Sequence, residues 1–468
     1  MKLRDMCARV GIEVQDDTIV YGLCCDSRRC NVGDIFFSTN ADIDYIDEAI
    51  SRGAIAIVSS TPIHRKYITN LVVEDVRKMM SRMSSAFYQD AHKSLKLIAV
   101  TGTNGKTTIT DQLYKIGLKM GHKCGVIGTL GAKWENNSYD TGMTTPDSVT
   151  LHMLLSLMKN DGVEYVFMEA SAHAIHLDKL YGLHFEVAVF SNLTQDHLDY
   201  FGDMNAYKLA KMPLFVREYS SHVVVNTDDE VGREIYFQRE KDAITYALYN
   251  PADIFALDIN FSNTTTAILN LFDEIYTLNT SLTGIFNVYN ILAILGVVRI
   301  LGWDMDKCIK YLVDIPLPDG RFYMITNSKK KVIVDYAHTP DAILNVLKSA
   351  TILGRRKIVV FGCGGDRDKD KRGKMGEIAY KFADTLILTE DNTRSEKLLD
   401  IIHDISKGIA GEYIVVPNRE KAIKKAIDMA SSEDVVLVLG KGAEKYIEKN
   451  GEKIPFSDIQ CVHKLLEE

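Results

Sequence analysis

The fold is indicated most clearly by the stretch Leu97-Ile98-Ala99-Val100-Thr101-Gly102-Thr103-Asn104-Gly105-Lys106-Thr107-Thr108. It opens with an apolar run of strand length, and a helix-compatible segment follows its two glycines. A glycine-rich turn between a strand and a helix lets backbone N–H groups point at phosphate oxygens, and the helix N-terminus adds partial positive charge. The stretch therefore predicts a phosphate loop inside a parallel α/β sheet.

The side chains of this loop fit nucleotide binding. Lys106 can reach the terminal phosphates of a nucleotide, and the Thr107 hydroxyl can ligate Mg²⁺. The general pattern G-x-x-x-x-G-K-[ST] would put its first glycine at Val100, so this loop is a shorter form. The alternative interpretation is a glycine-rich turn with a chance Lys-Thr pair. The candidate ATP-binding residues of the loop are Gly102, Thr103, Asn104, Gly105, Lys106, Thr107 and Thr108.

Outward from the loop, apolar runs alternate with helical stretches, which predicts a parallel sheet with helical crossovers. The region from about 250 to 280, with a threonine-rich stretch at 263–266, is expected to be less regular, and a helix is expected over 287–300. The prolines and glycine of 316–320 predict a linker, after which the alternation restarts. The predicted strands are 97–100, 163–168, 187–190, 223–225, 332–334, 358–361, 386–388 and 435–439.

The length of 468 residues suggests about three domains. Residues before about 90 carry short apolar runs at 35–37 and 54–58, which predict two short buried strands. Together with the breaks near 90 and 318, this predicts domains at 1–90, 91–318 and 319–468.

Composition and charge exclude several classes of protein. The formal charge of −8, from 55 basic and 63 acidic residues, argues against a general nucleic-acid binder. No apolar run approaches the roughly 20 residues that span a bilayer, and no signal-peptide core follows the first charges, so we expect a cytoplasmic protein without a membrane partner. The eight cysteines are expected to be reduced thiols; the Cys25–Cys30 spacing lacks a second pair that would complete a zinc site.

Four further segments connect the loop to a family. They are Thr144-Thr145-Pro146-Asp147, Met168-Glu169-Ala170-Ser171-Ala172-His173-Ala174, Asn192-Leu193-Thr194-Gln195-Asp196-His197-Leu198-Asp199-Tyr200 and Asp335-Tyr336-Ala337-His338-Thr339-Pro340-Asp341-Ala342. With the loop, they resemble the Mur ligases, and within that family the branch that adds the third amino acid to UDP-MurNAc-L-Ala-D-Glu. The resemblance runs from about residue 20 to 460.

The resemblance implies a three-domain α/β protein: an N-terminal UDP-binding domain, a central P-loop ATPase domain with a parallel sheet, and a C-terminal Rossmann-like domain. It implies ATP-dependent amide formation through an acyl phosphate, and we expect the protein to be a monomer. The D-Glu γ-carboxylate would attack the γ-phosphate of ATP, the co-substrate, and the incoming amine would then attack the acyl phosphate. The partners are the small-molecule substrates: ATP, the UDP-MurNAc-dipeptide and a diamino acid.

The family motifs also imply which residues handle charge and metal. Two anions must approach each other in this reaction, so cations are needed to screen them. Mg²⁺ is the implied cofactor, and Lys106 is the implied phosphate-binding cation. Lys211 matches a family lysine that is carbamylated, although a lone helical lysine is more often a solvated surface residue. The implied catalytic residues are Lys106, Glu169, His197 and Lys211, and the implied metal ligands are Thr107, Glu169, His197 and Lys211.

Further substrate contacts follow from the same motifs. On the nucleotide, the resemblance implies Asn287, Asn290, Arg321, Asp335 and His338, all of which could equally be caps or surface residues. On the UDP precursor, it implies Ser27, Thr144, Thr145 and Ser171. The family's glycine-rich N-terminal segment is shortened here to 38–44, and Asp319 is an extra residue before Arg321.

The third domain carries the choice of amino acid. Asp391-Asn392-Thr393-Arg394 resembles the Asp-Asn-Pro-Arg signature of the family members that add meso-diaminopimelate. This amino acid differs from lysine by one carboxylate, which an arginine can bind in a bidentate way. Thr393 replaces a usual proline and Ala443 a usual histidine, and a solvated loop arginine is the alternative interpretation of Arg394. The implied amino-acid contacts are Arg367, Asp391, Asn392, Arg394, Gly440 and Glu444.

Three rival functions remain open at this level. The first is a related ligase that adds lysine or another amino acid, or one that serves a secondary pathway. The second is a non-catalytic homologue that binds nucleotide or precursor. Retention of Lys106, Thr107, Glu169, His197 and Lys211 argues against the second rival. The third is a folylpolyglutamate synthetase, which the 391–394 segment fits poorly.

Overall fold

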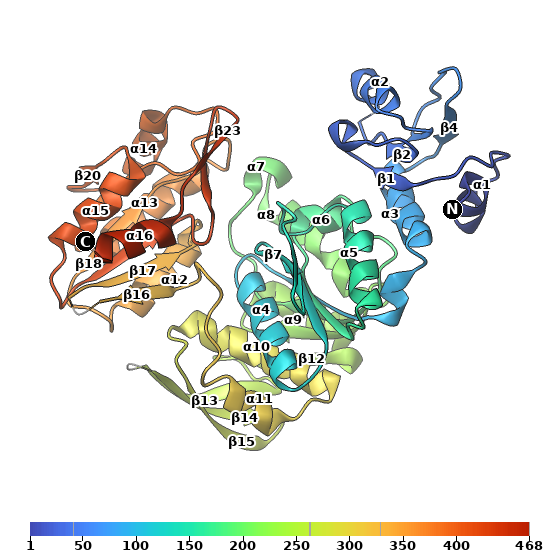
Figure 1. Cartoon of the computed structure of the whole chain (residues 1–468). Coiled ribbons are helices and arrows are strands. Elements are labelled where there is room, and N and C mark those ends of the chain that lie inside the picture. The colour runs from blue at the N-terminus through green and yellow to red at the C-terminus, as the bar shows by residue number, and fades with distance from the viewer. Residues whose placement is uncertain (41, 262–263, 328, 468) are drawn as a thin grey trace. The chain divides into compact units, whose positions relative to one another are not determined.

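A computed structural model describes residues 1–40, 42–261, 264–327 and 329–467 (Figure 1). The chain divides into two compact units. The first comprises residues 1–101, 120–188 and 210–222, and the second comprises 102–119, 189–209 and 223–468. The sheets are built mainly from parallel strands with helices between them, so the predicted α/β class is confirmed. Among the described residues, none of the helices has the length and apolar character needed to cross a membrane.

The N-terminal part of the first unit is a parallel sheet in the order β1-β2-β3-β4. One apolar cluster joins α1 and α3 to the strands, and a second packs α2 against them. The two strands predicted at 35–37 and 54–58 are confirmed as β2 and β3. The elements are α1 (Leu3–Arg9), β1 (Gly22–Cys24), η1 (Ser27–Arg29), β2 (Asp34–Phe37), α2 (Ile43–Ser51), β3 (Ala56–Ser59), β4 (Thr69–Val72), α3 (Val76–Phe87) and η2 (Ala91–Ser94).

The central sheet has the strand order β15-β14-β13-β12-β11-β10-β5-β9-β6-β7-β8. Its predicted strands at 97–100, 163–168, 187–190 and 223–225 are confirmed as β5, β9, β10 and β11. The first elements of this region are β5 (Lys96–Thr101), α4 (Lys106–Lys119), β6 (Cys124–Gly128), β7 (Gly131–Trp134), β8 (Asn137–Tyr139), α5 (Ser148–Asn160), β9 (Tyr165–Glu169), α6 (Ala172–His176), β10 (Phe185–Phe190), α7 (Leu198–Phe201), α8 (Met204–Lys211) and η3 (Met212–Phe215).

The expectation of an irregular region from about 250 to 280 is wrong. The chain there forms β13, β14 and β15, an antiparallel meander, with residues 262 and 263 of the threonine-rich stretch outside the described residues. Buried and exposed residues alternate along β14, as they do in a strand with one solvated face. The remaining central elements are β11 (Ser220–Asn226), α9 (Glu230–Arg239), η4 (Glu240–Asp242), β12 (Ala243–Ala247), β13 (Ile254–Phe261), β14 (Thr265–Leu271), β15 (Glu274–Thr280), α10 (Ile285–Leu301) and α11 (Met305–Tyr311).

The C-terminal sheet has the order β16-β17-β21-β18-β19-β20, and only β16 is antiparallel among its described pairings. Ile333 and Leu437 pack with α12, α13 and α14, whereas their neighbours Val334 and Val438 pack with α15 and α16. Helices therefore cover both faces of the sheet, as a Rossmann-like arrangement requires (Figure 1).

The four strands predicted in this region are confirmed as β17, β18, β19 and β21. The elements are β16 (Tyr323–Thr326), β17 (Lys331–Asp335), α12 (Pro340–Ala350), β18 (Lys357–Phe361), α13 (Asp370–Phe382), β19 (Thr385–Leu388), α14 (Leu398–Ser406), β20 (Ile414–Val415), α15 (Arg419–Met429), β21 (Val435–Leu439), β22 (Tyr446–Lys449), β23 (Glu452–Pro455) and α16 (Asp458–Glu467).

Candidate active site

The phosphate loop connects the end of β5 at Thr101 to the start of α4 at Lys106. Gly102 and Gly105 have φ values of 144° and 92°, which favour glycine. A Cβ on Gly102 would lie 2.0 Å from the Ser191 hydroxyl, and one on Gly105 would lie 2.6 Å from the Asn290 amide oxygen. Both glycines are therefore required by space as well as by backbone conformation.

Hydrogen bonds from the segment after β10 fix the shape of the loop. The Asn104 N–H donates to the Asn192 side-chain oxygen at 3.0 Å, and the Ser191 hydroxyl donates to the Asn104 carbonyl at 2.6 Å. The Thr103 hydroxyl donates to the Thr194 carbonyl at 3.1 Å. These contacts hold the loop so that the N-terminus of α4, with Thr107 and Thr108 in its first turn, closes it.

Lys106 folds back over the loop. Its ammonium donates to the carbonyls of Gly102 and Thr103, at 2.9 and 2.8 Å. The positive charge thus lies against the loop, where the partial charge of the helix N-terminus also favours an anion.

Arg321, Asp335 and His338 lie around the same loop. An Arg321 N–H donates to the Thr107 hydroxyl at 2.9 Å, and the Arg321 guanidinium stacks 4.4 Å from the centre of the Tyr336 ring. The Asp335 carboxylate accepts N–H bonds from Phe322 and Ala337, so it fixes the turn that carries Arg321; burial raises the pKa of Asp335. Arg321 therefore reaches the loop despite the extra residue before it.

Asp196 links His338 to His197. Its carboxylate lies 3.5 Å from a ring nitrogen of each histidine and 2.9 Å from the ammonium of Lys371. Burial alone would raise the pKa of Asp196, but the His338 hydrogen bond and the nearby positive charges hold it well below its usual range. His197 does not directly follow its strand: it lies after the loop 191–196, at the start of α7, with a φ of 56°.

The buried amides of α10 complete this part of the site. Asn287 donates to the Thr283 carbonyl at 2.8 Å, and Asn290 donates to the Asn287 side-chain oxygen at 3.3 Å. Asn104 donates to the Asp341 carboxylate at 3.1 Å. Neither Asp341 nor Lys371 was among the sequence candidates, although Asp341 lies in the quoted segment 335–342.

A second group of candidates gathers around Glu169, the last residue of β9. The Thr129 N–H and hydroxyl donate to its carboxylate at 2.8 and 3.2 Å, and the Thr129 and Thr144 hydroxyls are 3.1 Å apart. The Thr145 hydroxyl donates to the Glu169 carbonyl at 2.8 Å and lies 3.3 Å from that of Ser171. Thr144, Thr145, Glu169 and Ser171 are thus brought together, with Thr129 as an unpredicted member.

Two further candidates are Ser27 and Lys211. Ser27 lies in η1 and donates to the Glu48 carboxylate at 2.6 Å. Lys211 ends α8 and is 1% exposed, so the alternative interpretation of a solvated surface lysine is wrong. Glu169 and Lys211 belong to the first compact unit, and Thr107 and His197 belong to the second.

The donor chemistry of these four residues suits a divalent cation that prefers oxygen. Thr107 supplies a hydroxyl and Glu169 a carboxylate, whereas a carbamylated Lys211 would supply a second carboxylate-like group. The Glu169 carboxylate is almost fully buried and accepts two hydrogen bonds from Thr129. Hydroxyl and carboxylate oxygens are ligands that Mg²⁺ prefers, so the chemistry of these donor groups fits Mg²⁺.

The amino-acid candidates meet at the C-terminal sheet. The Asn392 side chain donates to Glu444 at 2.9 Å and accepts from Lys441 at 3.0 Å, and Lys441 also pairs with Glu444 at 2.7 Å. Gly440 has a φ of 113°, and a Cβ there would lie 2.6 Å from the Asp391 carboxylate. Asp391, Asn392, Gly440 and Glu444 therefore form one cluster around Lys441, which is fully buried and was not a candidate.

The two candidate arginines, Arg394 and Arg367, differ in how firmly their side chains are held. Arg394 donates to the Gly365 carbonyl at 2.7 Å and to Glu448 at 3.2 Å, and its side chain is 21% exposed. It is therefore held in place and is not a solvated loop arginine. Arg367 is exposed and donates to the Asp366 carbonyl at 3.1 Å. A buried Arg419–Asp458 pair at 2.7 Å, also outside the sequence candidates, ties α15 to α16.

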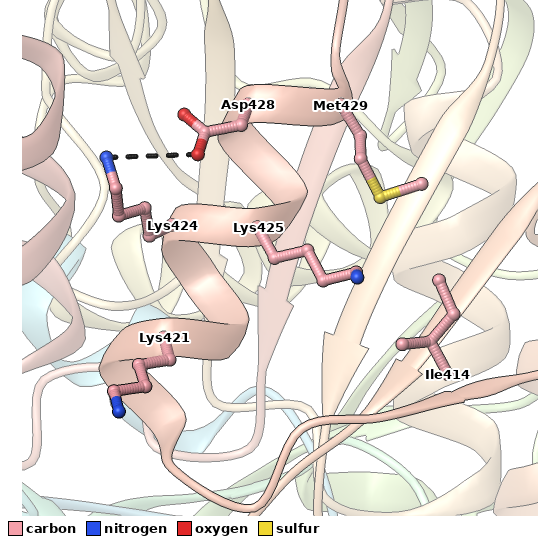
Figure 2. Close-up of a pocket in the computed structure, with 6 residues that line it drawn as sticks. All are labelled: Ile414, Lys421, Lys424, Lys425, Asp428 and Met429. Carbon is pink, nitrogen blue, oxygen red and sulfur yellow. Dashed lines mark ion pairs between the residues drawn. The ribbon is translucent and has the colours of Figure 1, made fainter.

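A pocket of about 520 Å³ on the C-terminal sheet lies at none of these candidates. Figure 2 shows it between Ile414 and α15, with Lys424 paired to Asp428 at 3.8 Å. Its basic groups are side chains of an exposed helix face, so it adds nothing to the site.

Comparisons with known proteins agree with this geometry. Residues 100–298 match the Mur ligase middle domain, and residues 320–442 match the Mur ligase, glutamate ligase domain. A UDP-N-acetylmuramoyl-L-alanyl-D-glutamate–2,6-diaminopimelate ligase of Halalkalibacterium halodurans is 40% identical over 94% of this chain and 93% of its own length. The same-named protein of Aquifex aeolicus is 39% identical over 96% of this chain and 94% of its own length.

Solved structures show the same likeness. A structure of a ligase with that name has a TM-score of 0.71 and 32% identity, covering 100% of this chain and 99% of its own. MurF ligase of Thermotoga maritima in complex with ADP has a TM-score of 0.66 and 20% identity, covering 97% and 98%, and shares the fold. With the domain matches and the relatives of about 40% identity, these findings show that the chain belongs to the Mur ligase family.

Proposed function

We propose that this protein is the ATP-dependent ligase that adds meso-diaminopimelate to UDP-MurNAc-L-Ala-D-Glu during peptidoglycan precursor synthesis. The observation that carries the proposal is the surroundings of Arg394. Its guanidinium is held by Gly365 and Glu448 at the edge of a cluster that contains Asn392, Lys441 and Glu444. An oriented guanidinium beside ammonium and carboxylate groups suits a ligand with an amine and an extra carboxylate.

The proposed reaction begins at the phosphate loop. Lys106 and the N-terminus of α4 bind the ATP phosphates and stabilise the charge that develops on the transferred γ-phosphoryl group. The Arg321 guanidinium, which donates to the Thr107 hydroxyl, supplies a second positive charge beside the loop. The D-Glu γ-carboxylate attacks the γ-phosphorus, ADP leaves, and an acyl phosphate results. Mg²⁺, when bound by Thr107, Glu169, His197 and Lys211, supplies charge neutralisation.

The second step forms the amide. The neutral amine of the diamino acid attacks the acyl phosphate, and a tetrahedral intermediate collapses with release of phosphate. Gly440 and Glu444 hold the distal amino and carboxylate groups, and Arg394 and Arg367 bind carboxylates, as the family resemblance suggests. Thr144, Thr145 and Ser171 hold the precursor, and Ser27 contacts its uridine end. We further propose that the ligase is cytoplasmic and monomeric, with domains at 1–90, 91–318 and 319–468.

Phosphate release tests the proposal. The full chain is incubated with ATP, Mg²⁺ and UDP-MurNAc-L-Ala-D-Glu, and meso-diaminopimelate, L-lysine or neither is added. We expect release with meso-diaminopimelate at a rate well above the other two mixtures. Equal release with L-lysine would keep the ligase and overturn the amino-acid assignment, whereas absence of release in all three would overturn the reaction.

A further inference from the structure

Cys24, Cys30 and Asp34 of the N-terminal sheet form a cluster that the function proposed above does not use. The two sulfur atoms and a carboxylate oxygen of Asp34 lie within 4.8 Å of one another. In the part of the chain that the structure describes, this is the one group of three His, Cys, Asp or Glu side chains with such spacing. All three residues are buried. The sequence spacing drew attention to Cys25 and Cys30, but the fold brings Cys24 to Cys30 instead.

The fold positions the three groups through the pairing of β1 with β2. Gly22 is opposite Asp34 in this parallel register, and a Cβ on Gly22 would lie 2.4 Å from an Asp34 carboxylate oxygen. The carboxylate therefore occupies the space above Gly22. Because Gly22 and Cys24 are two residues apart on one strand, their side chains share a face, and the carboxylate lies beside the Cys24 thiol. The turn through η1 returns Cys30 to the same place.

The surroundings of the cluster leave the carboxylate without a positive partner. Cys24 and Cys30 belong to an apolar cluster with Phe36, Ile46 and Ile57. The Asp34 carboxylate accepts the Asn31 N–H at 2.8 Å, and none of the ion pairs among the described residues involves Asp34. A buried carboxylate is costly unless it is paired or coordinates a metal, and two adjacent sulfurs supply the other ligands for one.

We propose that Cys24, Cys30 and Asp34 bind a thiophilic divalent cation such as Zn²⁺. Zinc–sulfur bonds of about 2.3 Å and zinc–oxygen bonds of about 2.0 Å in a tetrahedron separate the ligand atoms by about 3.5–3.8 Å. The spacing of at most 4.8 Å therefore needs a contraction of no more than about 1.3 Å. Thiolate ligands select Zn²⁺ over Mg²⁺, so the site is chemically distinct from that of the magnesium cofactor. Binding releases two thiol protons for each ion, and a water molecule can take the fourth position.

The position of the site predicts that a bound ion stabilises the turn through η1. Cys24 and Cys30 lie on either side of η1, which carries Ser27, so a bound ion closes this turn onto β2. The ion would stabilise the turn in the folded chain. This inference concerns metal binding alone, so it holds or fails independently of the ligase reaction.

Cobalt titration of the reduced, metal-free full chain tests the site. We expect one equivalent of Co²⁺ to release two protons per chain and to give a thiolate-to-cobalt charge-transfer band, and Zn²⁺ to abolish the band by displacing Co²⁺. C24S and C30S should each lose at least half of the intensity of the band. C25S, a matched control at the neighbouring cysteine, should keep it, and D34N should weaken Co²⁺ binding at least tenfold.

Several results would overturn the proposal. One is the absence of a charge-transfer band in the wild-type chain, a result that does not depend on how the variants fold. A second is a band of undiminished intensity in C24S and C30S. A third is a Cys24–Cys30 disulfide in the denatured, unreduced protein, which would leave six free thiols. The two cysteines would then form a redox-active pair and not a metal site. Circular dichroism of each variant distinguishes a lost ligand from an unfolded chain.

Discussion

At the scale of a single residue, we propose that Arg394 determines the choice of amino acid. Hydrogen bonds to charged groups contribute about 1.5–3 kcal/mol, which corresponds to about a 10- to 100-fold change in binding. We therefore predict that Arg394→Ala raises the KM for meso-diaminopimelate by about this factor in steady-state assays at saturating ATP. Arg355→Ala is the control, because Arg355 is an exposed arginine of the same sheet region. An unchanged KM in Arg394→Ala would remove the role assigned to this side chain.

We propose that Lys106 stabilises the charge of the phosphates during the reaction. Removal of one preorganised charge-stabilising group costs about 10²–10³ in kcat. We predict a loss of at least this size in phosphate release for Lys106→Ala, because its ammonium lies directly on the loop carbonyls. Lys119→Ala, at the exposed end of the same helix, should retain activity. Equal activity in the two variants would show that the loop does not carry the reaction.

The sequence singled out candidate residues that lie in short contiguous motifs. The phosphate loop and the 391–394 segment are of this kind. It missed residues whose partners are distant along the chain: Thr129 on Glu169, Lys441 on Asn392, and Lys371 on Asp196. Lys441 directly follows the candidate Gly440 in the sequence, but only the folded chain shows that Lys441 is fully buried.

At the scale of elements, a glycine precedes α4 in the phosphate loop and another follows the end of the helix. Gly105 has a φ of 92° with an Asn290 oxygen in the way of a Cβ, whereas Gly121, just after the same helix, has a φ of 88° and nothing within 4 Å. Both Ala variants carry the backbone strain of a positive φ, about 1–3 kcal/mol. We predict that Gly105→Ala also loses ATP binding in calorimetry and Gly121→Ala does not. Equal ATP affinity in the two variants would contradict the proposed steric requirement.

The β13–β15 meander lies where the sequence suggested a less regular region. Along β14, the polar Thr265 is buried and the apolar Ile268 is exposed, so the sequence obscures the alternation of buried and exposed positions that the folded sheet has. The buried parallel strands were easier to predict, because strands covered on both faces are continuous apolar runs.

At the scale of the whole molecule, a buried histidine pair makes stability depend on pH. His92 and His152 pack edge to face with ring centres 5.3 Å apart, and burial lowers the pKa of His152 to about 3. This stabilisation is complete above the unfolded value of about 6.5 and is lost as the pH falls toward 3. We predict about 2 kcal/mol of destabilisation at pH 5 relative to pH 8 from His152 alone.

Denaturant unfolding at the two pH values measures this effect. His152→Phe keeps the aromatic volume and removes the titration, so its loss of stability between pH 8 and pH 5 should be smaller than that of the wild type. A variant of His64, an exposed histidine of the same unit, should behave as the wild type does. Identical pH dependence in His152→Phe and the wild type would contradict the assignment.

Product formation in a competition tests the central claim most directly. The chain is given ATP, Mg²⁺ and UDP-MurNAc-L-Ala-D-Glu with equal concentrations of meso-diaminopimelate and L-lysine, and the UDP-linked products are separated by mass. The Arg394 surroundings predict that the diaminopimelate tripeptide is formed almost exclusively. A product that carries mainly lysine, or unchanged dipeptide after ATP has been consumed, would contradict it.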